Sequence, residues 1–239
     1  MHGDVYMEGT KLKWKKHVKH LGNYLSQDLS DERDIGFKKG RFYNSVNRVC
    51  ALFGKMPSKI VNTLYSSYCT SFYGSQLWDF NSRFIKEMYI AWQKSIRRIW
   101  KLPYRTHTKL LRFLCSNAMH IEDQLMLRFA KLYHKMLHNE NDLVSFITKN
   151  GTTYIHGTLG MNCLYIALRF KVSLNTLNNH DYTHFHEIVK NCLLHYEDES
   201  AKDIASAIIE LTDARDGELE IDNLSRVDLL ALLDNLCTD

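Results

Sequence analysis

Apolar residues recur at every third or fourth position along most of this 239-residue chain, and only two prolines interrupt the pattern. A period near 3.6 residues places such side chains on one face of an α-helix, whereas a half-buried strand would alternate. Hydrophobic residues make up 45% of the composition, enough for several helices to bury a common core. The sequence therefore predicts a mainly α fold.

The clearest periodic segments predict a bundle of three helices. The first begins near Ser30, whose hydroxyl can cap it, and ends near Gly54. The second begins at Pro57 and ends near Gly74, and the third spans about 83–101. Further helices are expected at about 121–138, 141–147, 162–172, 183–196, 200–211 and 224–237.

One segment ahead of these helices alternates with period two, which is typical of a strand. Its outward row is basic and comprises Lys11, Lys13, Lys15, His17 and Lys19. The opposite row, which contains Trp14 and Val18, is mostly apolar and is expected to pack on a core. A basic row of this kind either faces a polyanion or is only solvated, and the sequence supports both interpretations.

Charge divides the chain into two halves of opposite sign. Residues 1–135 hold 24 of the 31 Lys and Arg but only 10 of the 27 Asp and Glu, a net charge of +14. Residues 136–239 hold the remaining 7 and 17, a net charge of −10. A basic half is typical of a surface that contacts nucleic-acid phosphates, and an acidic end can fold back on it.

The third helix has the sharpest basic face. Helical spacing places Lys94, Arg97 and Arg98 opposite the apolar side that contains Trp92. Such a face is most often only solvated, but cations from several elements could form one phosphate-binding surface. The candidate nucleic-acid-binding residues are Lys11, Lys13, Lys15, Lys19, Lys94, Arg97, Arg98, Lys101, Arg105 and Lys109. Further cations share one side of the helix at 121–138, namely Arg128, Lys131 and Lys135.

No catalytic or cofactor motif accompanies these charges. P-loop, dinucleotide-binding, nucleophile-elbow and H-E-x-x-H patterns are missing, and the basic half has no adjacent Asp pair for a two-metal site. Asp31, Glu32 and Asp34 are interpreted as first-turn helix charges. The densest group of possible metal ligands is His180, His184, His186, Cys192 and His195. Its spacing fits no zinc pattern, so neither a metal, nor a cofactor, nor an enzyme is predicted.

The sequence also indicates a compartment. It has no apolar run long enough to span a bilayer and no secretory signal pattern. The six cysteines are widely spaced and are expected to be free thiols in a reducing environment. The expected location is intracellular, either nuclear or cytoplasmic.

Four strings stand in a characteristic order in the basic half: VKHLG at 18–22, LYSSY at 64–68, SFYGSQLW at 71–78 and RRIWKLPYRTH at 97–107. Between the first two lies a basic helix with Arg41, Asn44 and Asn47. Over about residues 12–140, this order resembles the region that follows the palm in non-LTR (LINE-type) retrotransposon reverse transcriptases.

The resemblance implies three parts. Residues 1–30 would be a remnant of the palm or connection with a basic β-strand. Residues 31–115 would be a thumb-like three-helix bundle, and residues 116–239 a helical extension that is acidic from about 197. Thumbs of this family hold the template–primer duplex through its backbone, which implies binding of RNA–DNA hybrid or duplex without sequence specificity.

The paired aspartates that hold Mg²⁺ in the family's palm have no counterpart here. The chain is therefore expected to be a non-catalytic fragment, a remnant of a transposable element. The alternative is an all-helical interaction module whose basic half binds an acidic partner or its own acidic tail.

Overall fold

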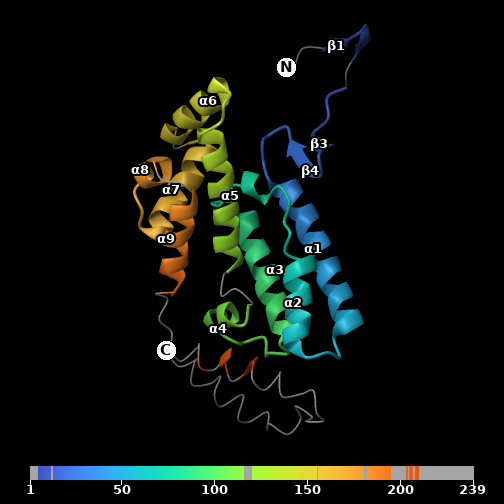
Figure 1. Ribbon diagram of the computed structural model, residues 1–239. Helices are drawn as coiled ribbons and strands as arrows, with labels where there is room; N and C mark the ends of the chain where they lie inside the picture. Colours follow the sequence, from blue (N-terminus) through green and yellow to red (C-terminus); the bar gives the residue numbers. More distant parts are fainter. Residues whose placement is uncertain are drawn as a thin grey trace.

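The computed structural model describes residues 5–11, 13–115, 120–154, 156–179 and 182–194, together with residues 203, 205, 206, 208 and 209. This part of the chain is mainly α-helical, with short antiparallel strands near its N-terminal end, as the sequence predicted (Figure 1). The helix expected at 224–237 and most of the one at 200–211 lie outside the described residues.

The strands form two small hairpins. β1 (Tyr6–Met7) pairs with β2 (Thr10–Lys11), and β3 (His17–His20) pairs with β4 (Asn23–Ser26). Both residues of the turn between β3 and β4 have positive φ, 45° and 84°. This is the backbone geometry of a type I′ turn, whose twist matches that of the paired strands.

The prediction of a single basic strand from Lys11 to Lys19 is wrong. Residues 13–16 have no regular structure, so β2 and β3 belong to separate hairpins. Trp14 and Val18, which were expected to pack on the core, are 59% and 50% exposed. Among the described residues no strand pairs with residues 13–16, so no sheet face buries Trp14.

Three helices form the predicted bundle: α1 (Glu32–Phe53), α2 (Ser58–Tyr68) and α3 (Arg83–Ile99) pack against one another in pairs. The buried side chains follow the expected helical spacing and include Ile35, Phe42, Val46, Val61, Tyr65, Ile85, Met88, Trp92 and Ile96. Each such burial is worth roughly 1.5–3 kcal/mol, so this core is the main stabilising contribution. α2 ends earlier than expected, and the 3₁₀ turn η1 (Ser75–Leu77) follows it.

Two side-chain contacts give the direction of the long helices. Lys39 of α1 pairs with Glu87 of α3, and two turns further along Asn47 accepts a hydrogen bond from Arg98. α1 and α3 therefore run parallel. Figure 1 shows α1 at one side of the molecule and α7 to α9 at the other, with α3 and α5 between them.

The remaining helices are α4 (Thr108–Phe113), α5 (Ile121–Leu137), α6 (Asp142–Thr153), α7 (Thr158–Phe170), α8 (Leu174–Asn179) and α9 (Tyr182–Leu194). Asn141 caps α6, and this helix continues to Thr153, beyond the end expected near residue 147.

The hydrophobic core is continuous across residue 115, where the sequence placed a domain boundary. Asn162 of α7 is fully buried, donates to the Trp78 carbonyl at 2.8 Å and accepts from the Phe80 amide at 3.0 Å. The later helices are thus fastened to the loop that precedes α3. No described helix combines the length and apolarity needed to cross a bilayer.

Candidate nucleic-acid interface

The N-terminal lysines do not form one row. Lys11 lies in β2, while Lys13 and Lys15 lie in the chain between the hairpins, and all are exposed. In Figure 1 the β1–β2 hairpin projects away from the helical bundle. Only Lys19, in β3, is held close to the bundle.

Lys19 belongs to a cluster of cations around two aromatic rings. The rings of Tyr24 and Phe37 meet edge to face with centroids 5.0 Å apart. Lys19 Nζ is 5.3 Å from the Phe37 centroid, and Arg33 Cζ is 5.4 Å from that of Tyr24. Arg41 Cζ is 5.9 Å from the Phe37 centroid. Each cation–π contact at an exposed site is worth about 0.5–1 kcal/mol, so these charges are positioned by the rings.

A buried charge joins the β3–β4 hairpin to the bundle. Asp34 is 4% exposed and accepts from the Tyr24 amide at 2.9 Å, from Trp78 Nε1 at 2.8 Å and from Lys38 Nζ at 2.5 Å. Lys38 also donates to Asn23 Oδ1 at 2.5 Å. Asp34 lies in the first turn of α1, as expected, but its partners also come from the hairpin and from the loop before α3. We call this junction the Asp34 joint.

Asp31, the N-cap residue of α1, is half-buried. Its Oδ2 accepts from the Asp79 amide at 2.6 Å, and burial raises the pKa of Asp31 to about 6. Glu32, in contrast, is exposed in the first turn of α1, as expected.

The cations at the end of α3 have different roles. Lys94 and Arg98 are exposed, and Arg98 donates to Asn47 of α1. The expected outward position is wrong for Arg97, which is half-buried and donates to the Thr106 carbonyl from Nε at 3.1 Å and Nη2 at 2.8 Å. Burial lowers the pKa of Arg97, so this guanidinium mainly fastens the loop that follows α3.

The remaining candidates lie beyond the helix. Lys101 has a left-handed backbone with φ 54°, Arg105 lies in a turn, and Lys109 is in α4. All three side chains are exposed.

The sequence indicated a basic helix with Arg41 and Asn44, but the row on α1 to which they belong was not predicted. Arg33, Phe37, Arg41, Asn44 and Arg48 follow one another at spacings of four, four, three and four residues, and they share the outer side of the helix. Phe37 is half-buried and the other four are exposed, and no carboxylate lies in the row. Fifteen residues of helix span about 22 Å. The spacing of the arginines was the signal that would have identified this α1 outer row.

The α1 outer row connects the two groups of predicted cations. Lys19 lies at its beginning, on Phe37, and Arg98 lies near its end, on Asn47. Lys94 precedes Arg98 by one turn of α3 and shares its side of that helix. We define the α1–α3 basic surface as Lys19, Arg33, Arg41, Arg48, Lys94 and Arg98.

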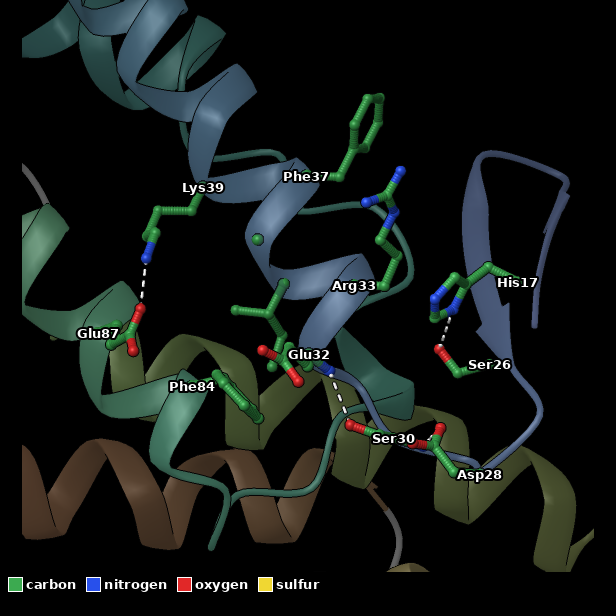
Figure 2. A pocket seen from close by; sticks show the side chains of 12 residues that line it. His17, Ser26, Asp28, Ser30, Glu32, Arg33, Phe37, Lys39, Phe84 and Glu87 are labelled. Carbon is green, nitrogen blue, oxygen red and sulfur yellow. Dashed lines mark hydrogen bonds and ion pairs between the residues drawn. The ribbon is translucent and has the colours of Figure 1, made fainter.

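A polar groove borders this surface. It has a volume of about 680 Å³ and lies between the β3–β4 hairpin and the beginnings of α1 and α3 (Figure 2). Its charged lining residues are Asp28, Glu32, Glu87, Arg33, Lys39 and His17. Lys39 pairs with Glu87 and lowers its pKa, while the Ser30 hydroxyl accepts from the Glu32 amide at 3.3 Å. The groove has no excess of positive charge and does not favour a phosphate.

A buried ionic cluster lies away from the basic surface. Asp123 of α5 is fully buried, 3.5 Å from Arg112 of α4 and 3.4 Å from Arg169 of α7. Next to it, His120 Nδ1 accepts from the Glu122 amide and caps α5. Burial, with Arg112 and Arg169 adding to it, lowers the pKa of His120 to about 4. The cluster fastens α4 and α7 to α5.

The described thiols are not activated nucleophiles. Cys50, Cys69, Cys115 and Cys163 are free. Burial raises the pKa of Cys69 to about 11 and that of Cys115 and Cys163 to about 12, the opposite of what a reactive thiolate requires.

Metal ligands do not gather in the described part of the chain. No group of three or more His, Cys, Asp or Glu suited to a metal ion occurs among the described residues. His134 and His138 lie one turn apart with ring centroids at 4.4 Å, which offers two ligands. His180, His195 and the side chain of Cys192, from the densest cluster in the sequence, lie outside the described residues.

Comparison of the chain with protein-family models, with curated proteins and with solved structures gave no match.

Proposed function

We propose that this chain is a non-catalytic part of a non-LTR retrotransposon reverse transcriptase that grips the backbone of an RNA–DNA hybrid or duplex without reading its sequence. The single observation that supports the proposal most is the α1–α3 basic surface, whose six cations are exposed on β3, α1 and α3. Cations on a rigid helix can follow a phosphate backbone, and they bind it whatever the bases are. The protein would act in the nucleus or cytoplasm.

The pairing state of these cations supports this assignment. Among the described residues, Arg33 and Arg41 contact aromatic rings, and Arg98 contacts an amide oxygen. In contrast, Lys38 and Lys39 on the same helix are paired with carboxylates. Charges that are not neutralised within the protein are the ones that can release counterions from a nucleic acid.

The test is a salt titration of binding to a 20-base-pair RNA–DNA hybrid. Each phosphate contact on a duplex contributes roughly −0.9 to the slope of log K against log salt. Replacing Arg33, Arg41 and Arg48 with Gln should therefore make the slope shallower by about 2.7. A second, unrelated hybrid sequence should bind equally.

The matched control is the triple variant Lys149→Gln, Lys171→Gln, Lys190→Gln, which removes the same charge from exposed positions on α6, at the end of α7 and on α9. It should keep nearly the whole slope. The proposal fails if the protein binds no nucleic acid at low salt, or if the control variant loses as much as the α1 variant. Equal affinity for a polyglutamate peptide would favour the alternative, a module for acidic protein partners.

A further inference from the structure

A second pocket opens on the side of α1 that faces the β3–β4 turn. It has a volume of about 300 Å³, at the lower end of small-ligand pockets. Its lining includes Gly22, Lys38, Arg41, Tyr68, Phe72 and Tyr73. The lining includes two cations and no carboxylate, which distinguishes this pocket from the polar groove. We call it the tyrosine pocket.

Two aromatic side chains stand exposed at this pocket. Tyr68, the last residue of α2, is 70% exposed, and Tyr73 in the following loop is 64% exposed. Exposed single aromatics are common on proteins, but these two lie together with Arg41 in the lining of one pocket. Rings of this kind offer flat faces on which another ring can stack.

The walls of the pocket are fixed before any ligand arrives. Arg128 of α5 donates to the carbonyls of Thr70 and Ser71, so these hydrogen bonds fix the loop after α2 to α5. Phe72 of the same loop is buried, with its ring centroid 5.5 Å from that of Phe42. Arg128 was expected on an outward basic side of α5, but its guanidinium is instead bonded to this loop. A fixed loop reduces the conformational entropy that binding would cost.

The β3–β4 turn forms the opposite wall. A Cβ built on Gly22 would lie 3.8 Å from the Tyr73 ring, so the turn lies close to one side of this ring. Gly74 has φ 81°, and a Cβ there would lie 1.9 Å from Asn23 Oδ1. The loop therefore approaches the turn so closely that only glycine is accommodated.

Arg41 connects this pocket to the α1 outer row. It lines the pocket and also lies over Phe37 on the outer row. No carboxylate within 4 Å of Arg41 is found in the described part of the chain. Lys38 is neutralised by Asp34, so Arg41 is the charge available to a ligand. A strand held on the outer row therefore passes the mouth of the tyrosine pocket.

We propose that the tyrosine pocket receives one unpaired nucleotide of a single-stranded extension, with its base stacked on Tyr68 or Tyr73 and its phosphate on Arg41. This inference rests on the proposed function and adds a preference for single-stranded extensions. Exposed aromatics beside a basic groove are how proteins hold single strands without reading sequence, because every base has a π-face. In a duplex those faces are covered by the neighbouring stacked base pairs, so a blunt duplex has no unpaired base for the pocket.

The experiment compares a blunt 16-base-pair RNA–DNA hybrid with the same hybrid carrying a four-nucleotide unpaired extension, measured by fluorescence anisotropy. The extension should tighten binding by about tenfold, the effect expected of one stacked base. The double variant Tyr68→Ala, Tyr73→Ala should lose this gain while binding the blunt hybrid normally. Tyr68→Phe, Tyr73→Phe should keep the gain, because the ring faces remain.

The control variant is Phe146→Ala, Tyr154→Ala, which removes aromatics that are 64% and 62% exposed at α6 and should leave the gain intact. Circular dichroism melting would confirm that every variant is folded. The inference is overturned, with the proposed function intact, if the blunt hybrid binds but the extension adds nothing or the alanine pair keeps the gain. Failure of the blunt hybrid to bind at all overturns the proposed function instead.

Discussion

His120 should make the protein less stable as the pH falls below 6.5. Its pKa is lowered to about 4 by burial, so between these values the unfolded chain binds a proton that the native protein excludes. The stability is therefore fully present above pH 6.5 and is lost as the pH falls toward 4. The full difference of about 2.5 pKa units corresponds to about 3 kcal/mol, and roughly 2.5 kcal/mol of it is lost by pH 4.5.

Asp31 acts in the opposite direction over almost the same range. Its pKa is raised from 3.8 to about 6, so the native protein binds a proton that the unfolded chain releases. Lowering the pH from 7 to 4.5 should therefore stabilise the fold by about 1–2 kcal/mol through this group, since it is partly exposed. The two effects partly cancel, and together they should leave a loss of about 0.5–1.5 kcal/mol between pH 7 and 4.5.

The assay is urea unfolding followed by circular dichroism at pH 7.5, 6.5, 5.5 and 4.5, with four proteins. They are the unmodified chain, Asp31→Asn, His120→Asn and the double variant. Asparagine keeps a cap acceptor at residue 120 and removes the titration. In the Asp31→Asn background, stability should fall by about 2.5 kcal/mol between pH 7.5 and 4.5, relative to the double variant.

The control is His156→Asn, which removes an exposed histidine and should not change the profile. A flat profile for Asp31→Asn, compared with the double variant, would refute the reasoning. It would mean that His120 is protonated in the native protein as easily as in the unfolded chain.

Three further substitutions test how the hairpin and α1 are built. Asp34→Ala leaves Lys38 buried without its partner and should cost about 3–5 kcal/mol in urea unfolding. Gly74→Ala should cost about 2 kcal/mol or more, because its φ of 81° and the contact with Asn23 both oppose a side chain. Gly36→Ala should instead raise the melting temperature, with about 0.5–1 kcal/mol gained, because no atom of the described residues outside this helix's own backbone lies within 4 Å of a Cβ added there inside α1. A stabilising Gly74→Ala would contradict the described loop.

The helices could be predicted because each depends on residues close in sequence. The buried stripe of α1, from Ile35 to Val49, recurs at helical spacing, and Pro57 and Asn141 mark the beginnings of α2 and α6. The segment from Lys13 to Lys16 shows the limit of such patterns. Alternation predicts a strand only if a second strand pairs with it, and that is a property of the whole chain.

The candidate surface could be predicted only in part. The exposure of Lys94 and Arg98 follows from the helical period, and the same reasoning applied to α1 would have identified Arg33, Arg41 and Arg48. The role of Asp34 could not be predicted, because Tyr24 and Trp78 lie 10 and 44 residues away. A first-turn carboxylate that faces water and one that accepts three hydrogen bonds have the same local sequence.

The Asp34 joint also contains an amide whose hydrogen-exchange rate can report ligand binding. The Tyr24 amide donates to Asp34, so its hydrogen exchange requires the hairpin to leave the bundle, without unfolding of the helices. Lys19 of the hairpin and Arg33 of α1 both contact the Tyr24 ring, so they belong to the two elements that this joint connects. A nucleic acid bound to both would hold the hairpin closed, and the Tyr24 amide would exchange more slowly as saturation rises, while amides in α7 keep their rates.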